Sequence, residues 1–277
     1  MDKKVIDNIV WYIPFRKLRD AVREYLNEHV KLLGENIRLS SEQIRLLNNL
    51  PDKNYKYDFK TYRSKILELV HKESTKESIK YICENGSNSI IFRYRREMFK
   101  FVFEEHVKTN DYKDKLFLEF GVFEGWSINV CSSLIPEVKF YGFDSFEGLP
   151  ETWNSSFFKG SFDVKGNLPK VNDNVSLIKG YFNETLPKFL EEHKEKAAFI
   201  HIDCDLYSST KTVFDNIYDR IVPNTVIQFD EYYNYPGWRN HEFKAFQEFC
   251  KKYNVEYEYI ATGCSTIVTV VIKSIKN

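Results

Sequence analysis

Residues 116–127 read LFLEFGVFEGWS, and residues 197–210 read AAFIHIDCDLYSST. In both stretches a short apolar run ends in glycine or acidic residues and then passes into a helical pattern. A buried strand that turns tightly into a helix has this character in a parallel sheet. The same alternation fills the chain after residue 115. The sequence therefore predicts an α/β fold with a Rossmann-like, mainly parallel sheet.

Seven strands are predicted, and helices separate most of them. The strands cover residues 116–120, 138–143, 175–179, 197–202, 225–229, 255–260 and 266–272. The helices cover residues 125–134, 183–194, 208–220 and 240–253. Since the last two strands follow one another directly, we expect an antiparallel hairpin at the end of the chain.

Three regions are predicted along the chain. Residues 1–54 form a helical region, because a basic, aromatic segment over 1–25 precedes a heptad pattern of apolar residues from Leu26 to Leu47. Residues 55–110 form a helical lead-in, and residues 111–277 form the sheet domain. Within the lead-in, Ser74 and Glu77 predict the start of a helix and Asn85-Gly86 its end, and the basic stretch 88–108 continues as helix.

Charge and composition limit the possible functions. The 277 residues include 40 Lys+Arg and 40 Asp+Glu, so a dedicated nucleic-acid binder is excluded. The first hundred residues hold 21 basic and 14 acidic side chains, which leaves 19 basic and 26 acidic ones for the rest. The basic region 1–25 either contacts the inner membrane peripherally or packs in an interface of a homo-oligomer.

The cysteines and the apolar runs indicate a compartment. The five cysteines are odd in number and widely spaced, which predicts buried free thiols in a reducing cytoplasm. We find no apolar run of the roughly 18–20 residues that a membrane helix needs. The expected location is therefore the cytoplasm, with at most peripheral contact at the inner membrane.

The first two strands point to a nucleoside cofactor. Gly121 and Gly125 would give a tight turn after the first strand, and Asp144 ends the second. A carboxylate at that place can bind both hydroxyls of a ribose. The pattern E-x-G-x-x-x-G lacks the third glycine of a turn that binds pyrophosphate. S-adenosylmethionine is therefore the expected cofactor, and a structural role for the glycine pair is the alternative.

The fourth and fifth strands end in acidic residues. Asp203 and Asp205 follow one strand, and Asp230 and Glu231 follow the next. Parallel strands bring these ends to one edge, where carboxylates suit Mg²⁺ or another hard divalent cation. Asp203, Asp230 and Glu231 are the predicted ligands. The alternative is that these acids cap helices, and for Asp205 we expect that role.

Four motifs resemble the macrocin O-methyltransferase family, a class I family that methylates sugar hydroxyls with S-adenosylmethionine. They are residues 118–125, 142–150, 180–187 and 203–210. The resemblance implies Mg²⁺ at Asp203, Asp230 and the next residue, although the family has aspartate where this chain has Glu231. The resemblance also implies cofactor contacts at Glu119, Gly121, Ser127, Asp144 and Ser145. With these, the predicted cofactor-binding residues are Glu119, Gly121, Val122, Phe123, Gly125, Ser127, Asp144, Ser145, Gly180, Tyr181, Phe182 and Asp203.

The catalytic base is left among three candidates. Related catechol-type enzymes have a lysine where this chain has Leu206, so a lysine base is not supplied there. Asp203 is the first candidate, and His201 and His241 are the others. His201 is equally well explained as a core histidine, and His241 as a residue that touches the substrate.

Two further groups of residues have alternative interpretations. The aromatic segment 232–238 suits either a carbohydrate ring or a packed loop. Arg93, Arg95 and Arg96 could meet an anionic acceptor, but a solvated helix face is the stronger expectation.

The predicted function is transfer of a methyl group from S-adenosylmethionine, with Mg²⁺, to a hydroxyl of a nucleotide sugar or surface glycan. An NAD-dependent oxidoreductase that modifies sugars and a non-catalytic coiled-coil scaffold are the alternatives.

Overall fold

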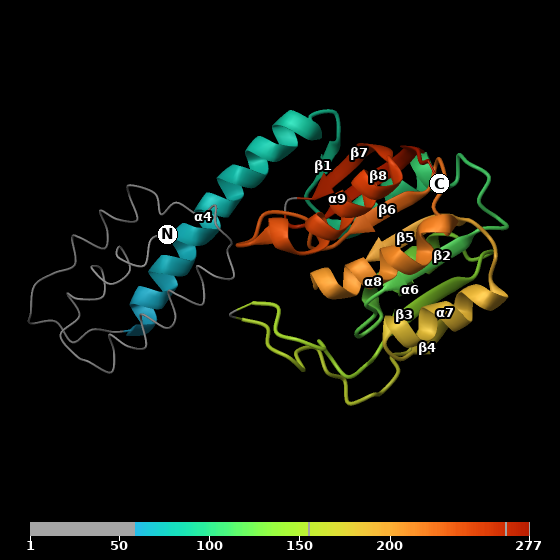
Figure 1. The fold of residues 1–277 in the computed structure, drawn as a ribbon, viewed down its shortest axis with the longest axis horizontal. Coiled ribbons are helices and arrows are strands. Elements are labelled where there is room, and N and C mark those ends of the chain that lie inside the picture. The colour runs from blue at the N-terminus through green and yellow to red at the C-terminus, as the bar shows by residue number, and fades with distance from the viewer. Residues whose placement is uncertain (1–58, 155, 264, 277) are drawn as a thin grey trace, which may run out of the picture. The chain divides into compact units, whose positions relative to one another are not determined.

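The computed structural model describes residues 59–154, 156–263 and 265–276 (Figure 1). The chain divides into two compact units, one of Met1–Glu77 with Tyr235–Gly237, and one of Ser78–Asn234 with Trp238–Asn277. The second unit contains the sheet and all of the predicted site residues. The amphipathic segment 1–25 and the heptad from Leu26 to Leu47 lie outside the described residues. None of the described helices has the length and apolar character needed to cross a membrane.

The sheet has eight strands rather than the predicted seven. They are β1 (Ile90–Phe92), β2 (Leu116–Phe120), β3 (Phe140–Asp144), β4 (Val175–Lys179), β5 (Ala197–Ile202), β6 (Val226–Phe229), β7 (Glu256–Gly263) and β8 (Val268–Ser274). The additional strand, β1, pairs in parallel with β7. The other seven confirm the predicted strands to within a few residues. The α/β prediction is thus confirmed, with one edge strand missed.

The helices alternate with the strands, as predicted. They are α4 (Phe59–Asn85), α5 (Arg95–Val102), the π-helix η1 (Phe103–Val107), α6 (Trp126–Leu134), α7 (Phe182–Glu192), α8 (Tyr207–Ile217), the 3₁₀ turns η2 (Tyr218–Arg220) and η3 (Trp238–Asn240), and α9 (Glu242–Tyr253). The predicted continuous helix over 88–108 is wrong at its start, because residues 90–92 extend as β1 before α5 begins.

The helix start predicted at Ser74 is also wrong. Helix α4 is already continuous through that position, and the Ser74 hydroxyl donates to the carbonyl of Val70 at 3.0 Å, one turn back. A serine can make this bond inside a helix, so a capping pattern alone does not mark a helix start. The predicted helix end is confirmed, since α4 stops at Asn85.

The strand order explains where a ligand can bind. The order is β1-β7-β8-β6-β5-β2-β3-β4, and β8 runs antiparallel to both of its neighbours, as the predicted final hairpin requires. The chain leaves β2 in one direction, toward β3 and β4, and then returns to β5 on the other side of β2. Such a reversal opens a crevice at the carboxyl ends of the strands, where α/β proteins bind ligands.

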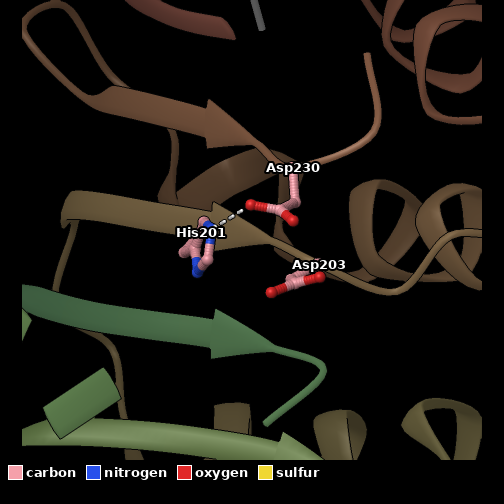
Figure 2. Close-up of side chains that lie close together, drawn as sticks. All are labelled: His201, Asp203 and Asp230. Atoms are coloured by element: carbon pink, nitrogen blue, oxygen red, sulfur yellow. Dashed lines mark ion pairs between the residues drawn. The ribbon is translucent and has the colours of Figure 1, made fainter. Parts of the chain in front are cut away.

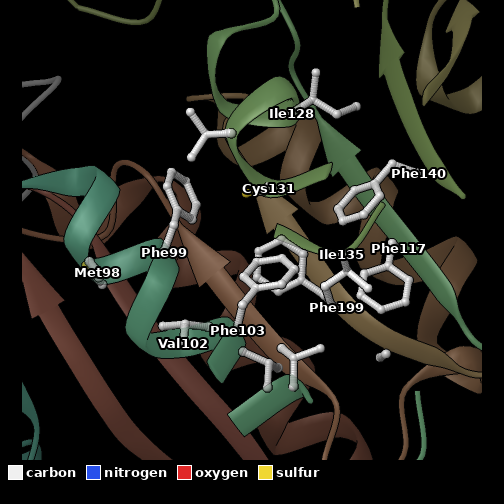
Figure 3. Packing of buried hydrophobic residues seen from close by; sticks show 14 of the residues in the cluster. Met98, Phe99, Val102, Phe103, Phe117, Ile128, Cys131, Ile135, Phe140 and Phe199 are labelled. Atoms are coloured by element: carbon white, nitrogen blue, oxygen red, sulfur yellow. The ribbon is translucent and has the colours of Figure 1, made fainter. Parts of the chain in front are cut away.

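Helices cover both faces of the sheet. On one face α5, η1 and α6 bury Phe99, Phe103 and Ile128 against the strands (Figure 3). The Phe103 ring lies 4.7 Å from that of Phe199 on β5. On the other face the Phe214 ring of α8 lies 6.2 Å from that of Phe229 on β6. Burial on both faces holds the strand ends in fixed positions, and with them the side chains that follow.

The described cysteines agree in part with the predicted buried thiols. Cys131, Cys204 and Cys250 are buried and free, whereas Cys83 is free but exposed. The fifth, Cys264, lies outside the described residues.

Candidate active site

The turn after β2 is shaped by Gly121. Its φ of 91° lies in the left-handed region that favours glycine. A Cβ atom at this position would lie 1.7 Å from the carbonyl oxygen of Asp203. Only a glycine therefore lets the turn after β2 touch the turn after β5, and this contact brings two predicted site residues together.

Gly125 has a different environment from the one expected. Its φ is 79°, but a Cβ atom there would face Pro169 and Val171 at 3.4 Å, an ordinary contact distance. Gly125 begins helix α6 and does not line the cavity described below. Its backbone conformation thus serves the entry into the helix.

Asp144 joins two loops beside that turn. Its Oδ2 atom accepts hydrogen bonds from the amides of Val122 and Phe123, both at 2.8 Å. Its Oδ1 atom accepts one from the amide of Phe146 at 2.7 Å. The carboxylate also lines the cavity. It therefore holds the loop after β2 in place while keeping one side toward a ligand.

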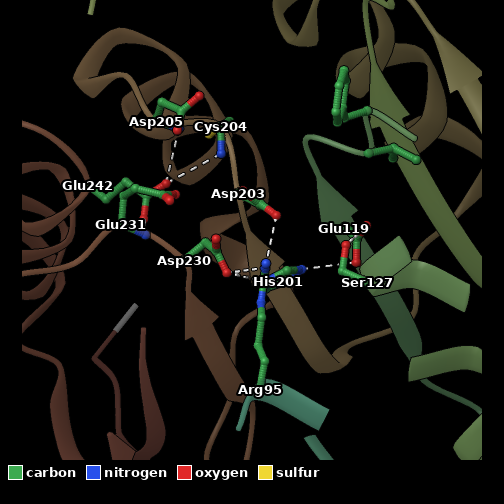
Figure 4. Close-up of polar contacts among 12 residues, drawn as sticks. Arg95, Glu119, Ser127, His201, Asp203, Cys204, Asp205, Asp230, Glu231 and Glu242 are labelled. Carbon is green, nitrogen blue, oxygen red and sulfur yellow. Dashed lines mark hydrogen bonds and ion pairs between the residues drawn. The ribbon is translucent and has the colours of Figure 1, made fainter. Parts of the chain in front are cut away.

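Glu119 and Ser127 lie beneath the site. The Ser127 hydroxyl donates to Oε1 of Glu119 at 2.8 Å, and the Nδ1 nitrogen of His201 lies 2.9 Å from Oε2 (Figure 4). Neither Glu119 nor His201 lines the cavity, and both are buried. These two predicted cofactor contacts and one predicted base thus form a buried network under the strand ends.

His201 connects this network to the acids above it. Its Nε2 nitrogen lies 3.8 Å from Oδ1 of Asp230 (Figure 2). Burial alone would lower the pKa of His201, but the carboxylates of Asp230 and Glu119 raise it to about 10. A protonated ring between two carboxylates holds them in place and cannot accept a further proton. His201 thus lies between the carboxylates of Glu119 and Asp230 and does not line the cavity.

Four acids, here called the acid edge, follow β5 and β6: Asp203, Asp205, Asp230 and Glu231. All four line the cavity. Ligand atoms of His201, Asp203 and Asp230 lie within 4.8 Å of one another, and so do those of Asp203, Asp205 and Glu231. Asp205, expected to cap a helix, is thus part of the cluster. It was missed because its backbone turns at a φ of 60°, which a sequence pattern does not reveal.

Crowding of negative charge changes how these acids ionise. Burial and the charge of Asp230 raise the pKa of Asp203 to about 7. Burial and the neighbouring aspartates raise the pKa of Glu231 as well. Burial also opposes the ionisation of Asp230, yet His201 and Arg95 hold its pKa below the ordinary value. Ionisation of all four acids together is therefore unfavourable unless a cation lies beside them.

Arg95, at the start of α5, supplies one such cation. Its Nη2 atom donates to Oδ2 of Asp203 at 3.3 Å and also bonds Oδ1 of Asp230 (Figure 4). Its guanidinium lies over the Trp126 ring, 5.3 Å from the centroid. The expected solvated face is wrong for Arg95, while Arg93 and Arg96 are exposed. Asp203 lies 108 residues after Arg95 in the sequence, and Asp230 lies 135 residues after it. No local pattern could therefore have predicted these ion pairs.

Glu242, in the first turn of α9, supports the acid edge from behind. It is fully buried, and its Oε1 atom accepts from the amide of Asp205 at 3.2 Å. Its Oε2 atom accepts from the amide of Glu231 at 3.2 Å. The preceding residue, His241, does not line the cavity, and burial lowers its pKa to about 4. Of the three predicted bases, the structure therefore brings only Asp203 to the cavity.

The cavity occupies about 570 Å³, within the range of small-molecule sites. It is lined by ten of the predicted site residues: Gly121, Phe123, Asp144, Ser145, Gly180, Tyr181, Phe182, Asp203, Asp230 and Glu231. Six others lie outside it: Glu119, Val122, Gly125, Ser127, His201 and His241. Sequence reasoning missed Arg95, Asp205, the aromatic residues Trp153, Phe157 and Phe162, and the hydroxyl residues Ser208, Ser209 and Thr212.

The aromatic segment 232–238 contributes to the core. Tyr232 and Trp238 are fully or almost fully buried, and the Tyr232 hydroxyl lies 2.7 Å from that of Tyr259 on β7. The Trp238 ring packs edge-on against Phe243, at 4.8 Å between centroids. Neither ring lines the cavity. Of the two interpretations, the packed loop is therefore the one that the structure supports.

Comparison with known proteins agrees with this geometry. Residues 118–232 match a family described as "Methyltransferase domain". This part of the chain contains the turn after β2, Asp144 and the whole acid edge. The protein therefore carries a methyltransferase domain and is an enzyme of that class. The NAD-dependent alternative is not supported. No curated protein matches the sequence.

Two solved methyltransferase structures are similar to this chain. The calicheamicin methyltransferase CalS11 matches with a TM-score of 0.50 at 18% identity, over 80% of this chain and 98% of its own. The O-methyltransferase NovP matches with a TM-score of 0.48 at 20% identity, over 65% of this chain and 79% of its own. At 18% identity the likeness to CalS11 shows the fold alone, which is the Rossmann-like fold of class I methyltransferases.

Proposed function

We propose that the protein transfers a methyl group from S-adenosylmethionine to a hydroxyl oxygen of a sugar. The observation that carries this proposal is that one cavity is lined both by the loops that Asp144 joins and by the acid edge. A nucleoside cofactor and a hydroxyl acceptor can therefore share it. The CalS11 fold and the resemblance of four motifs to sugar O-methyltransferases support the same activity.

The cofactor would be held at the ends of β2, β3 and β4. Asp144 and Ser145 present polar atoms there, and Gly121 and Gly180 keep the backbone close to the cavity. Phe123 and Tyr181 add exposed rings. When bound, S-adenosylmethionine supplies an electrophilic methyl carbon attached to a positively charged sulfur. The surplus of carboxylates along the cavity suits that charge.

Asp203 is the proposed base. Methyl transfer forms a carbon–oxygen bond, breaks a carbon–sulfur bond and releases the hydroxyl proton, which the Asp203 carboxylate accepts. With a pKa of about 7, Asp203 is close to the value that suits a general base near neutral pH. Arg95 bonds this carboxylate, and the turn of Gly121 lies against the backbone carbonyl of Asp203.

The acid edge also fits a hard divalent cation such as Mg²⁺. The carboxylates of Asp203, Asp205 and Glu231 would hold it, and their close spacing and surplus charge are what such an ion requires. This set differs from the predicted one in one member, because Asp230 groups with His201 and Asp203 whereas Asp205 groups with Asp203 and Glu231. When bound, the ion would lower the pKa of the acceptor hydroxyl.

We extend the proposal to the N-terminal part of the chain. Residues 1–54 would serve oligomerisation or peripheral membrane contact, ahead of a lead-in over 55–110 and a catalytic domain over 111–277. The enzyme would then act in the cytoplasm or at the inner membrane.

Titration calorimetry with S-adenosylhomocysteine tests the activity. We expect binding to the full chain, and Asp144→Asn should weaken it about tenfold or more, because the carboxylate both orders two loops and lines the cavity. Asp173→Asn, which alters an exposed carboxylate, is the matched control and should bind normally. Absence of binding at millimolar ligand would exclude the proposed cofactor.

A further inference from the structure

Four aromatic side chains line one part of the cavity and are called here the aromatic shelf: Phe123, Trp153, Phe157 and Phe162. The Trp153 and Phe157 rings stack at 5.3 Å, and those of Phe157 and Phe162 at 5.0 Å. Phe123 meets Phe162 edge-on at 5.6 Å. The rings therefore form a continuous row along the cavity.

The exposure and the backbone conformation of the shelf are typical of a binding surface. Phe123, Phe157 and Phe162 are 40%, 37% and 38% exposed, although rings of this size are usually buried. Phe123 and Phe162 also adopt φ values of 48° and 67°, which bulky residues rarely do. Backbone strain of this kind persists only where the surrounding structure imposes it, and it occurs often at binding sites.

Local hydrogen bonds hold the shelf in place. The amide of Trp153 donates to the carbonyl of Phe157 at 3.0 Å, and the amide of Leu149 donates to that of Ser161 at 2.9 Å. The Ser208 hydroxyl of α8 donates to Glu151 at 2.6 Å and ties the loop to the sheet domain. These bonds hold the described ends of the loop against each other and against α8.

The charge of the cavity limits what the shelf can bind. Among its described lining residues the charged side chains are five carboxylates, those of Asp144 and the acid edge, and one guanidinium, that of Arg95. Arg95 already bonds Asp203 and Asp230. Among the described lining residues a diphosphate would therefore find no unpaired cationic side chain and would depend on a bound divalent cation, whereas an uncharged ligand needs no such partner.

Side chains with hydroxyl groups also line the cavity. Ser208, Ser209 and Thr212, on successive turns of α8, line the same cavity as the shelf. A lining that combines flat apolar rings with hydroxyl groups suits a ligand with an apolar face and a hydroxylated edge. A pyranose ring has both.

We propose that the aromatic shelf is the acceptor subsite and that it binds an uncharged sugar ring, such as the end of a neutral glycan, in preference to a nucleotide sugar. This inference rests on the proposed function and narrows its acceptor. The sugar lies with its C–H face on Phe157 and Phe162, and its hydroxyls meet the serine and threonine side chains of α8.

Saturation-transfer NMR on the full chain, with S-adenosylhomocysteine present, tests the proposal. The probes are a set of uncharged methyl hexopyranosides, with thymidine diphosphate glucose as the charged alternative. We expect saturation of the C–H protons of at least one glycoside and none of the thymine protons. Phe157→Leu should weaken glycoside binding roughly threefold to tenfold, and Phe157→Tyr, which keeps the ring, should restore it.

Phe158→Ala is the matched control, because Phe158 is adjacent, 58% exposed and outside the cavity lining. Its glycoside signal should equal that of the unaltered protein. Saturation of thymine protons that Phe157→Leu removes would show that the shelf stacks a nucleobase and would overturn the proposal. So would the absence of any glycoside signal, or a signal that Phe157→Leu leaves intact. Failure to bind S-adenosylhomocysteine would instead count against the proposed function.

Discussion

The acid edge and the aromatic shelf line the same cavity, but different parts of the fold hold them. The acid edge follows directly from the ends of β5 and β6, whose positions the packed sheet determines. The shelf comes mainly from the long connection between β3 and β4, where hydrogen bonds across the loop set the ring positions. In the proposed function, strand ends thus supply the groups for chemistry, and a loop supplies the surface that would select the acceptor.

The largest expected effect is a loss of turnover on substitution in the acid edge. Asp203→Asn removes the proposed base and should lower turnover by about 10² to 10⁴, the usual contribution of general base catalysis. Formation of S-adenosylhomocysteine, followed by mass spectrometry with a methyl glycoside that the NMR experiment identifies, measures it. Asp114→Asn, at an exposed carboxylate, is the control. Normal turnover by Asp203→Asn would remove Asp203 from the mechanism.

Arg95→Gln should have a smaller effect on stability and a distinctive one on metal binding. Without divalent ions, the free energy of unfolding should fall by roughly 1–2 kcal/mol, less than for a fully buried pair because Arg95 is 30% exposed. Mn²⁺ binding, measured by electron paramagnetic resonance, should tighten because the guanidinium no longer occupies the carboxylates. Arg96→Gln, at the exposed neighbour, should change neither quantity. If Arg95→Gln also left both unchanged, Arg95 would have no role in the charge balance of the acid edge.

The pH dependence of stability tests the network under the acid edge. The folded pKa of His201 is about 10 against an ordinary value of 6.5, so its stabilising contribution is complete below pH 6.5. The contribution is lost as pH rises toward 10, because the folded state binds a proton that the unfolded state does not. The thermal midpoint should therefore fall over this range, and fall less in His201→Gln. His71→Gln, at an exposed histidine, should follow the unaltered protein. Parallel curves for all three would contradict the charged pair with Glu119.

The smallest effect on stability should come from the shelf. Phe157→Leu, at a partly exposed loop position, should change the free energy of unfolding by no more than about 0.5 kcal/mol. Phe117→Leu, in the core between the sheet and its helices, should cost about 1 kcal/mol or more. Urea denaturation of both variants measures the difference. A large loss of stability in Phe157→Leu would make the shelf a packing feature and would weaken the contrast with the acid edge.

Much of the fold and part of the acid edge could be predicted from the sequence. Seven strands, their parallel arrangement with a final antiparallel hairpin, and the meeting of Asp203 and Asp230 at one edge follow from periodicity and strand direction. The prediction of a methyltransferase is confirmed, since the turn after β2, Asp144 and the acidic strand ends lie in the matched domain. Residue type and local spacing are enough here, because a parallel sheet brings every strand end to the same side.

Only the tertiary structure decided which of these residues face the cavity. Alternation along β5 predicts that His201 and Asp203 share a face, but packing buries His201 against Glu119 and leaves Asp203 at the cavity. Tyr232 and Trp238 pack in the core, whereas Trp153, Phe157 and Phe162 line the cavity, although each of the two segments holds four aromatic residues in the sequence. Arg95 reaches two aspartates more than a hundred residues away. Strand ends obey a local rule, whereas ion pairs and ring positions depend on how distant segments pack together.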